Sequence, residues 1–193
     1  MRTLIRSAAL LLVLSACAAG GQPGGEPSVP APADERGAIY AVLLDSMRHH
    51  APGVALKHRY VQVETVPPAR QIGYDHLMRE VPEATPDLIA AFQAAAEQPA
   101  DVRALVGRGE VEWIRRDSLA QVMRAVTAPE LPRAANLSTT RFSPIGMSPD
   151  GRRALVYVYY WCGGLCADQH WALLERQPDG RWTLRRTLLT IIS

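Results

Sequence analysis

Two cysteines and a histidine close to the C-terminus have the residue types and the spacing that metal or redox chemistry uses. Cys162, Cys166 and His170 form the pattern C-x3-C-x3-H. Soft thiolates together with an imidazole suit Cu(I), and a pair of thiolates also suits thiol-redox exchange. The two cysteines enclose only three residues, so in a hairpin they would stand opposite each other at the separation that a disulfide requires. We therefore expect a disulfide between Cys162 and Cys166, and we keep a copper or thiol-redox site that includes His170 as the alternative.

Aromatic side chains recur at strand spacing just before this pattern. Tyr157, Tyr159 and Trp161 would share one face of a strand, with Trp171 and Trp182 on the strands that follow. Large aromatic side chains at such spacing are typical of a core that helices cover. With only partial cover, the same face would become the wall of a groove for a glycan, a peptide or an apolar ligand. Tyr157, Tyr159 and Trp161 are therefore a candidate ligand face.

The remaining polar residues give no catalytic or cofactor motif. His49, His50 and His58 form the only cluster of histidines, but the positive charge of imidazolium is favourable at any helix C-terminus, which explains histidines there without a metal. The sequence contains no G-x-S-x-G, no H-E-x-x-H and no phosphate-binding glycine loop. A catalytic set of Ser148, Asp168 and His170 has no support from its spacing. We expect no catalytic residue and no cofactor.

The first residues predict export. Arg2 and Arg6 precede an apolar run that is too short to span a bilayer, and the run ends in Leu14-Ser15-Ala16-Cys17. This segment resembles the signal peptides of bacterial lipoproteins, which are cut before the cysteine. The resemblance implies that residues 1–16 are removed and that Cys17 carries a diacylglycerol and an amide-linked fatty acid such as palmitate.

A lipid anchor of this kind implies a place in the cell envelope and the membrane as a partner. Ala18 stands where enterobacterial lipoproteins of the inner membrane carry aspartate. We therefore expect the periplasmic side of the outer membrane, if the organism has two membranes. Such a compartment is oxidising, which favours the disulfide further.

Charge and composition separate a tether from a folded domain. Residues 17–33 consist of the cysteine and a stretch rich in glycine and proline that offers nothing for a core. Removal of the signal with its two arginines leaves 19 of the 21 basic residues, equal to the 19 acidic ones. A neutral mature chain argues against nucleic acid as a partner. An envelope protein or a small ligand remains, and residues 34–193 form the expected single domain.

Helical and strand patterns alternate in the first part of that domain. Ile39, Val42, Leu43 and Met47 form one apolar stripe, which predicts a helix that begins near Asp34. Strands are predicted over residues 57–66 and 110–114, and further helices begin at a Thr85 cap and at an Asp117 or Ser118 cap.

The last fifty residues predict an antiparallel meander. The turn sequences Pro149-Asp150-Gly151 and Pro178-Asp179-Gly180 separate strands over residues 153–161, 170–176 and 181–191. The strand over residues 153–161 is apolar on both faces, which predicts a central strand with cover on both sides. Taken together, the patterns predict an α+β fold. Its antiparallel sheet would have three to five strands, including a C-terminal meander of three or four, with the N-terminal helices packed mainly on one face.

The meander also resembles a family of secreted or lipid-anchored bacterial proteins that have no established function. The matching residues are Ala154-Leu155-Val156-Tyr157, Cys162-Gly163-Gly164-Leu165-Cys166, Leu173-Leu174-Glu175, Gly180-Arg181-Trp182 and Ser193. The resemblance covers less than half of the chain, and Ala167-Asp168-Gln169 departs from the glycine that the family favours there. It supports the β-meander and implies no particular activity. From the residues and the resemblance we expect a non-catalytic binding or interaction module.

Overall fold

A computed structural model describes residues 33–47, 58–68, 73–107, 111–127, 137–162 and 166–192 of the chain. The predicted signal peptide, Cys17, residues 18–32 of the tether, His49 and His50 lie outside the described residues, as does the side chain of His58. The elements follow one another as α1 (Ala33–Met47), β1 (His58–Gln62), α2 (Tyr74–Glu80), α3 (Pro86–Ala96), α4 (Val102–Val106), β2 (Glu112–Ile114), α5 (Arg116–Thr127), β3 (Leu137–Phe142), β4 (Gly146–Met147), β5 (Arg153–Trp161), β6 (Ala167–Arg176) and β7 (Trp182–Ile192).

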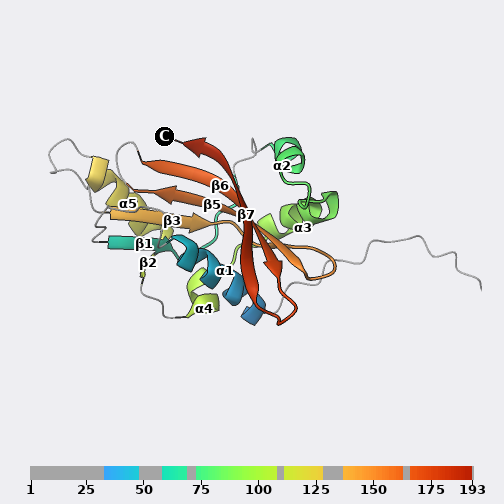
Figure 1. Ribbon diagram of the computed structural model, residues 1–193. Helices are drawn as coiled ribbons and strands as arrows, with labels where there is room; N and C mark the ends of the chain where they lie inside the picture. The colour runs from blue at the N-terminus through green and yellow to red at the C-terminus, as the bar shows by residue number, and fades with distance from the viewer. Residues whose placement is uncertain are drawn as a thin grey trace, which may run out of the picture.

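The strands form one mixed sheet of seven strands in the order β2-β1-β3-β5-β6-β7, with β4 pairing to β5 (Figure 1). The C-terminal meander is confirmed, because β3, β5, β6 and β7 are antiparallel neighbours. The expectation of three to five strands, all antiparallel, is corrected. β1 runs parallel to both β2 and β3. Parallel pairing needs a long crossover, and the helices between β1 and each of its partners supply it.

The apolar character of β5 on both faces has the predicted consequence, because β5 lies inside the sheet and is buried on both sides. Ala154, Val156 and Val158 belong to one core cluster, which also contains Ile39 and Leu43 of α1. The intervening residues of β5 belong to a second cluster that contains Leu77 of α2 and Leu88, Ile89 and Phe92 of α3. Residues of α1 and α4 share a core cluster with one face of β5, and residues of α2 and α3 share a cluster with the other face.

Local sequence signals explain where several elements begin and turn. Thr85 caps α3 as predicted, with its hydroxyl accepting from the backbone N–H of Leu88, and Pro86 takes the first helical position. Both predicted hairpin turns place glycine at a positive φ, 65° at Gly151 and 84° at Gly180.

Two close contacts fix helices on opposite faces of the sheet. The hydroxyl of Tyr40 on α1 donates a hydrogen bond of 2.9 Å to the carbonyl of Ser143, which follows β3. On the other face α3 approaches β4 so closely that any side chain at Gly146 would overlap the backbone of Phe92. These contacts hold α1 and α3 on the segment between β3 and β5, whereas α5 lies at the other end of the sheet, near the beginning of β3 (Figure 1).

Candidate functional site

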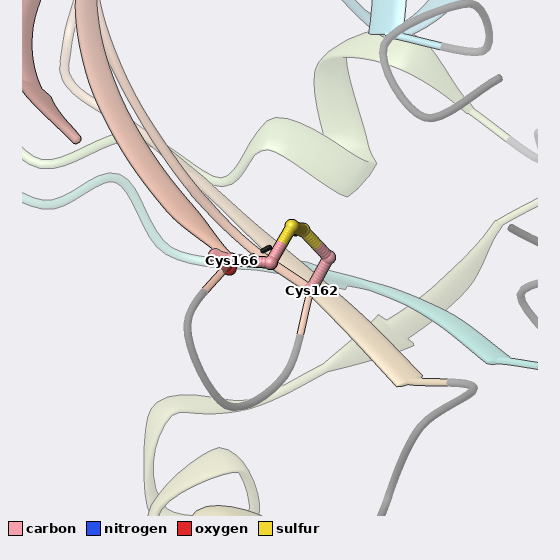
Figure 2. Close-up of a disulfide and its surroundings, with 2 residues drawn as sticks. All are labelled: Cys162 and Cys166. Atoms are coloured by element: carbon pink, nitrogen blue, oxygen red, sulfur yellow. Dashed lines mark hydrogen bonds between the residues drawn. A yellow bond between two sulfur atoms is a disulfide. The ribbon is translucent and has the colours of Figure 1, made fainter. Parts of the chain in front are cut away.

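The two cysteines of the C-x3-C pattern stand at disulfide distance at the end of the β5–β6 hairpin. Cys162 follows β5 and Cys166 precedes β6, their Cα atoms are 5.1 Å apart, and a disulfide joins them (Figure 2). The backbone N–H of Cys162 donates to the carbonyl of Cys166 at 2.7 Å, which continues the ladder of the hairpin. Cys162 is buried and Cys166 is exposed. The bridge therefore closes the hairpin at its last backbone pair.

The structure does not bring His170 to the cysteines. His170 pairs with Val158 in the middle of the hairpin, four positions along the chain from Cys166. At the usual rise of a strand this is about 13 Å. The imidazole is 4% exposed, and its Nδ1 lies 2.7 Å from Oδ1 of Asp168. Within the described residues, no three histidine, cysteine or acidic side chains are grouped so that they could hold a metal ion.

The structure also separates Ser148 from Asp168 and His170, the other members of the candidate catalytic set. Ser148 belongs to the turn before β5, where its hydroxyl binds the carboxylate of Asp150 at 2.5 Å and accepts from the backbone of Arg153. Arg153 pairs with Glu175, at the opposite end of the hairpin from Asp168. The hydroxyl of Ser148 stabilises its own turn.

The aromatic side chains of Tyr157, Tyr159 and Trp161 differ in burial: the first belongs to the core, and the other two line a pocket. Tyr157 is fully buried and packs edge-on against Trp171, which in turn packs against Phe92, with ring centroids 4.8 and 5.0 Å apart. Tyr159 is 9% exposed, and Trp161 is only partly buried. The prediction of a helix-covered core therefore holds for Tyr157, whereas cover thins along the strand toward the disulfide.

A pocket of about 330 Å³ opens where this cover thins. Gln62, Arg141, Tyr159 and Trp161 line it from the sheet, while α5 contributes Arg116 and Leu119. The register explains the wall, because Arg141 on β3 stands opposite Tyr159 on β5, and both side chains therefore lie on one face. Its volume lies within the range of sites for small ligands.

The pocket carries positive charge. The guanidinium carbon of Arg141 lies 4.8 Å from the centroid of the Tyr159 ring, a cation–π contact. Burial lowers the pKa of the Arg141 guanidinium, the phenol of Tyr159 raises this pKa, and the neighbouring cation of Arg116 lowers it again. The two guanidiniums therefore repel each other across one pocket.

The carboxylates of Asp168 and Glu64 have hydrogen-bond partners other than the arginines of the pocket. Asp168 is the only described carboxylate that borders the pocket, and it is bonded to His170. The carboxylate of Glu64 accepts from the backbone N–H of Arg116 at 3.2 Å, at the beginning of α5. Among the residues that the structure describes, no carboxylate comes within ion-pair distance of the Arg141 guanidinium.

Sequence reasoning identified the aromatic half of this site and missed its polar half. No sequence signal set Gln62 apart, because it stands among the polar residues of the alternating strand His-Arg-Tyr-Val-Gln, and only the structure shows that it is 2% exposed. Its amide donates to the carbonyl of Glu64 at 2.9 Å, which holds it in the wall. Arg141 stood in a strand pattern without any feature that linked it to Tyr159 or Arg116.

A second pocket of about 290 Å³ lies on the other face, between α1 and the sheet. Leu44, Met47 and Val61 give it an apolar lining, to which Asp45 and Arg59 add one charge of each sign. Its charges offset each other, so it lacks the excess of positive charge that Arg116 and Arg141 give to the pocket at α5.

Comparisons with protein-family models, with curated proteins and with solved structures find no match to this chain. Among the described helices, none combines the length and the apolar character that crossing a membrane requires. The case for a function therefore rests on the residues themselves.

Proposed function

We propose that the chain is a lipid-anchored protein of the cell envelope whose domain is a non-catalytic binding module, and that the pocket at α5 holds its ligand. The predicted lipidation of Cys17 supplies the anchor, with the outer membrane favoured in an organism that has two membranes. Residues 18–32 are rich in glycine and proline, a composition typical of a tether, and such a tether would let the domain extend from the membrane surface.

The observation that carries the proposal is the partly covered aromatic face. Small-ligand sites combine an apolar, often aromatic lining with a few polar groups that fix the orientation of the ligand. Tyr159, Trp161 and Leu119 supply such a lining, and Gln62 and Arg141 supply the polar groups. The disulfide supports the same interpretation, because it joins Cys162, which follows Trp161 directly, to Cys166 before β6 and so fixes the end of the strand that carries Trp161.

The copper or redox alternative is less well supported. It needs two free thiolates and a third ligand within bonding distance. The cysteines stand at disulfide distance from each other. His170 lies further along β6, and its Nδ1 is hydrogen-bonded to Asp168.

The anchor is tested on the mature protein. Wild type should partition into the detergent phase and show the intact mass of the chain from Cys17 onward plus diacylglycerol and acyl groups. Cys17→Ser should remain in the aqueous phase without lipid mass. A wild-type protein that lacks diacylglyceryl mass would contradict the anchor and leave the binding module untouched.

The pocket is tested with a neutral aromatic dye, N-phenyl-1-naphthylamine, whose fluorescence rises in an apolar site. Ala120 lines the pocket and is exposed, so Ala120→Trp should fill the pocket without disturbing the fold. Gln121→Trp is the matched control, because Gln121 is an exposed neighbour that does not line the pocket. We expect dye binding in wild type and in Gln121→Trp and its loss in Ala120→Trp. Equal binding by all three would show that the dye uses another surface.

A further inference from the structure

We propose that the pocket at α5 is an oxyanion site, which takes a small ligand with a carboxylate or phosphate on a flat apolar body. Arg141 would hold the anion, Arg116 would assist at the rim, and Tyr159 and Trp161 would contact the flat body. The inference rests on the proposed function and deepens it, because it assigns a chemical class to the ligand of the same pocket.

Arg141 carries a positive charge that no described carboxylate pairs with. Its guanidinium is partly buried, and burial of a cation is unfavourable unless an anion compensates it. The described chain offers the face of Tyr159, at 4.8 Å, and no carboxylate at ion-pair distance. A ring face is a weak substitute for an anion. A bound oxyanion would supply the missing partner.

Arg116 adds a second positive charge to the pocket. Arg116 lines the same pocket from α5, close enough for its charge to influence Arg141. Two like charges that share a pocket destabilise the empty protein, and an anion between them removes that repulsion. The carboxylates of Asp168 and Glu64 are hydrogen-bonded to His170 and to the backbone N–H of Arg116, and within the described residues neither forms an ion pair with the guanidinium of Arg141 or Arg116.

The position of Arg141 over a ring also limits the shape of the ligand. A guanidinium over a ring face makes no hydrogen bond to that ring, so its in-plane N–H groups can donate to two oxygens of one carboxylate or phosphate. The ligand must then lie beside Tyr159 and reach Trp161 and Leu119, which are an aromatic ring and an aliphatic chain. A flat apolar body next to the anionic group fits this surface.

The test compares phenyl phosphate and benzoate with benzyl alcohol, which is a neutral ligand of similar size. Binding is followed by NMR through the indole N–H of Trp161 and the side-chain Nε–H of Arg141. We expect both anions to bind about tenfold more tightly than benzyl alcohol at low salt, and we expect the difference to shrink at high salt.

Three variants assign the effect to residues. Arg141→Gln should remove most of the preference for the anions and leave the binding of benzyl alcohol unchanged. Arg116→Ala should reduce the preference by a smaller factor. Arg115→Ala removes the same charge from the adjacent, exposed position, which does not line the pocket, and should change nothing. Should Arg141→Gln fail to fold, the comparison of Arg116→Ala with Arg115→Ala decides.

The outcomes separate this inference from the proposed function. If all three ligands shift Trp161 equally and the arginine variants have no effect, the oxyanion site is overturned and the binding pocket stands. If no ligand shifts Trp161, and the neutral dye also fails to bind, both are overturned. Anion binding that Arg115→Ala weakens as much as Arg116→Ala would reflect general surface charge and would also overturn the site.

Discussion

Helices cover the two ends of the β5–β6 hairpin to different extents, although large apolar side chains line both ends. We call the end that α3 covers the closed end, and we call the end next to the disulfide, which is only partly covered, the open end. At the closed end Leu155 and Leu173 are buried beneath α3. At the open end Tyr159 and Trp161 face a pocket that α5 covers incompletely. The strand is apolar throughout, so the difference comes from the helix that lies over each part.

The two helices differ in what they place against the sheet. α3 presents Leu88, Ile89 and Phe92, all buried, and a glycine on β4 allows it to approach closely. α5 presents Leu119 together with Ala120 and Arg116, both exposed at this surface. A continuous apolar strand therefore becomes core under one helix and a candidate site under the other.

The largest expected effect is at the closed end. Trp171→Ala removes a fully buried ring that contacts both Tyr157 and Phe92. We expect a loss of about 3–5 kcal/mol in the free energy of unfolding, because the cavity cannot collapse between α3 and the sheet. Chemical denaturation measures it, and a loss below about 1 kcal/mol would show that the closed end is not packed as described.

The disulfide should have an intermediate effect. Replacing Cys162 and Cys166 together with serine should cost about 2 kcal/mol at most, because so short a ring removes little entropy from the unfolded chain. Thiol counting should find no free thiol in the purified protein before reduction.

The same residues allow the copper alternative to be tested. After reduction, a titration with Cu(I) should show no stoichiometric binding that depends on His170, since His170 lies about 13 Å along β6 from Cys166. Tight one-to-one binding that weakens in His170→Ala would contradict the structural role of the pair and revive the metal site.

Trp161→Ala makes the same substitution as Trp171→Ala on the open end. Trp161 is only partly buried, so we expect a loss on the order of 1 kcal/mol in the free energy of unfolding. Binding of N-phenyl-1-naphthylamine should nevertheless fall severalfold, because Trp161 is part of the pocket wall. Equal destabilisation by the two tryptophan variants would abolish the distinction between the two ends.

The smallest effect should come from deletion of residues 18–32, which leaves α1 intact. The composition of this stretch offers nothing for a core, so the melting temperature should change by a few degrees at most. Dye binding should also stay unchanged. A large fall in either quantity would mean that these residues contribute to the domain or to its pocket.

Sequence patterns captured the meander better than the rest of the fold. The two apolar faces of β5 and the two Pro-Asp-Gly turns are local features, and the strands that they predict pair with their chain neighbours. The partners of β1 are remote, and an alternating pattern does not say which strand it joins or in which direction. α4, with five residues, is too short to show a helical period.

The candidate site was also predictable only where it depends on local spacing. Tyr159 and Trp161 could be assigned to a strand face from their spacing. Their exposure depends on which helix covers them, and the stripe around Leu119 contains no information about where on the sheet α5 lies. Arg141 enters the site only through its register with Tyr159, a pairing between segments that spacing alone does not align.

The parallel pairing of β1 has a consequence for how the chain reaches its native state. His58 pairs with Leu137, so roughly eighty residues must be made before β1 finds its inner neighbour. The contact order of this half is high, and such contacts form slowly because loop closure precedes any compensating contact. The meander needs only hairpin contacts, and we expect it to fold first and to serve as the template on which Val61 and α1 assemble. Until then a growing chain would expose the unpaired backbone of β1 together with Val61 and Val63, which are buried in the native state, and this makes it the segment most in need of a chaperone.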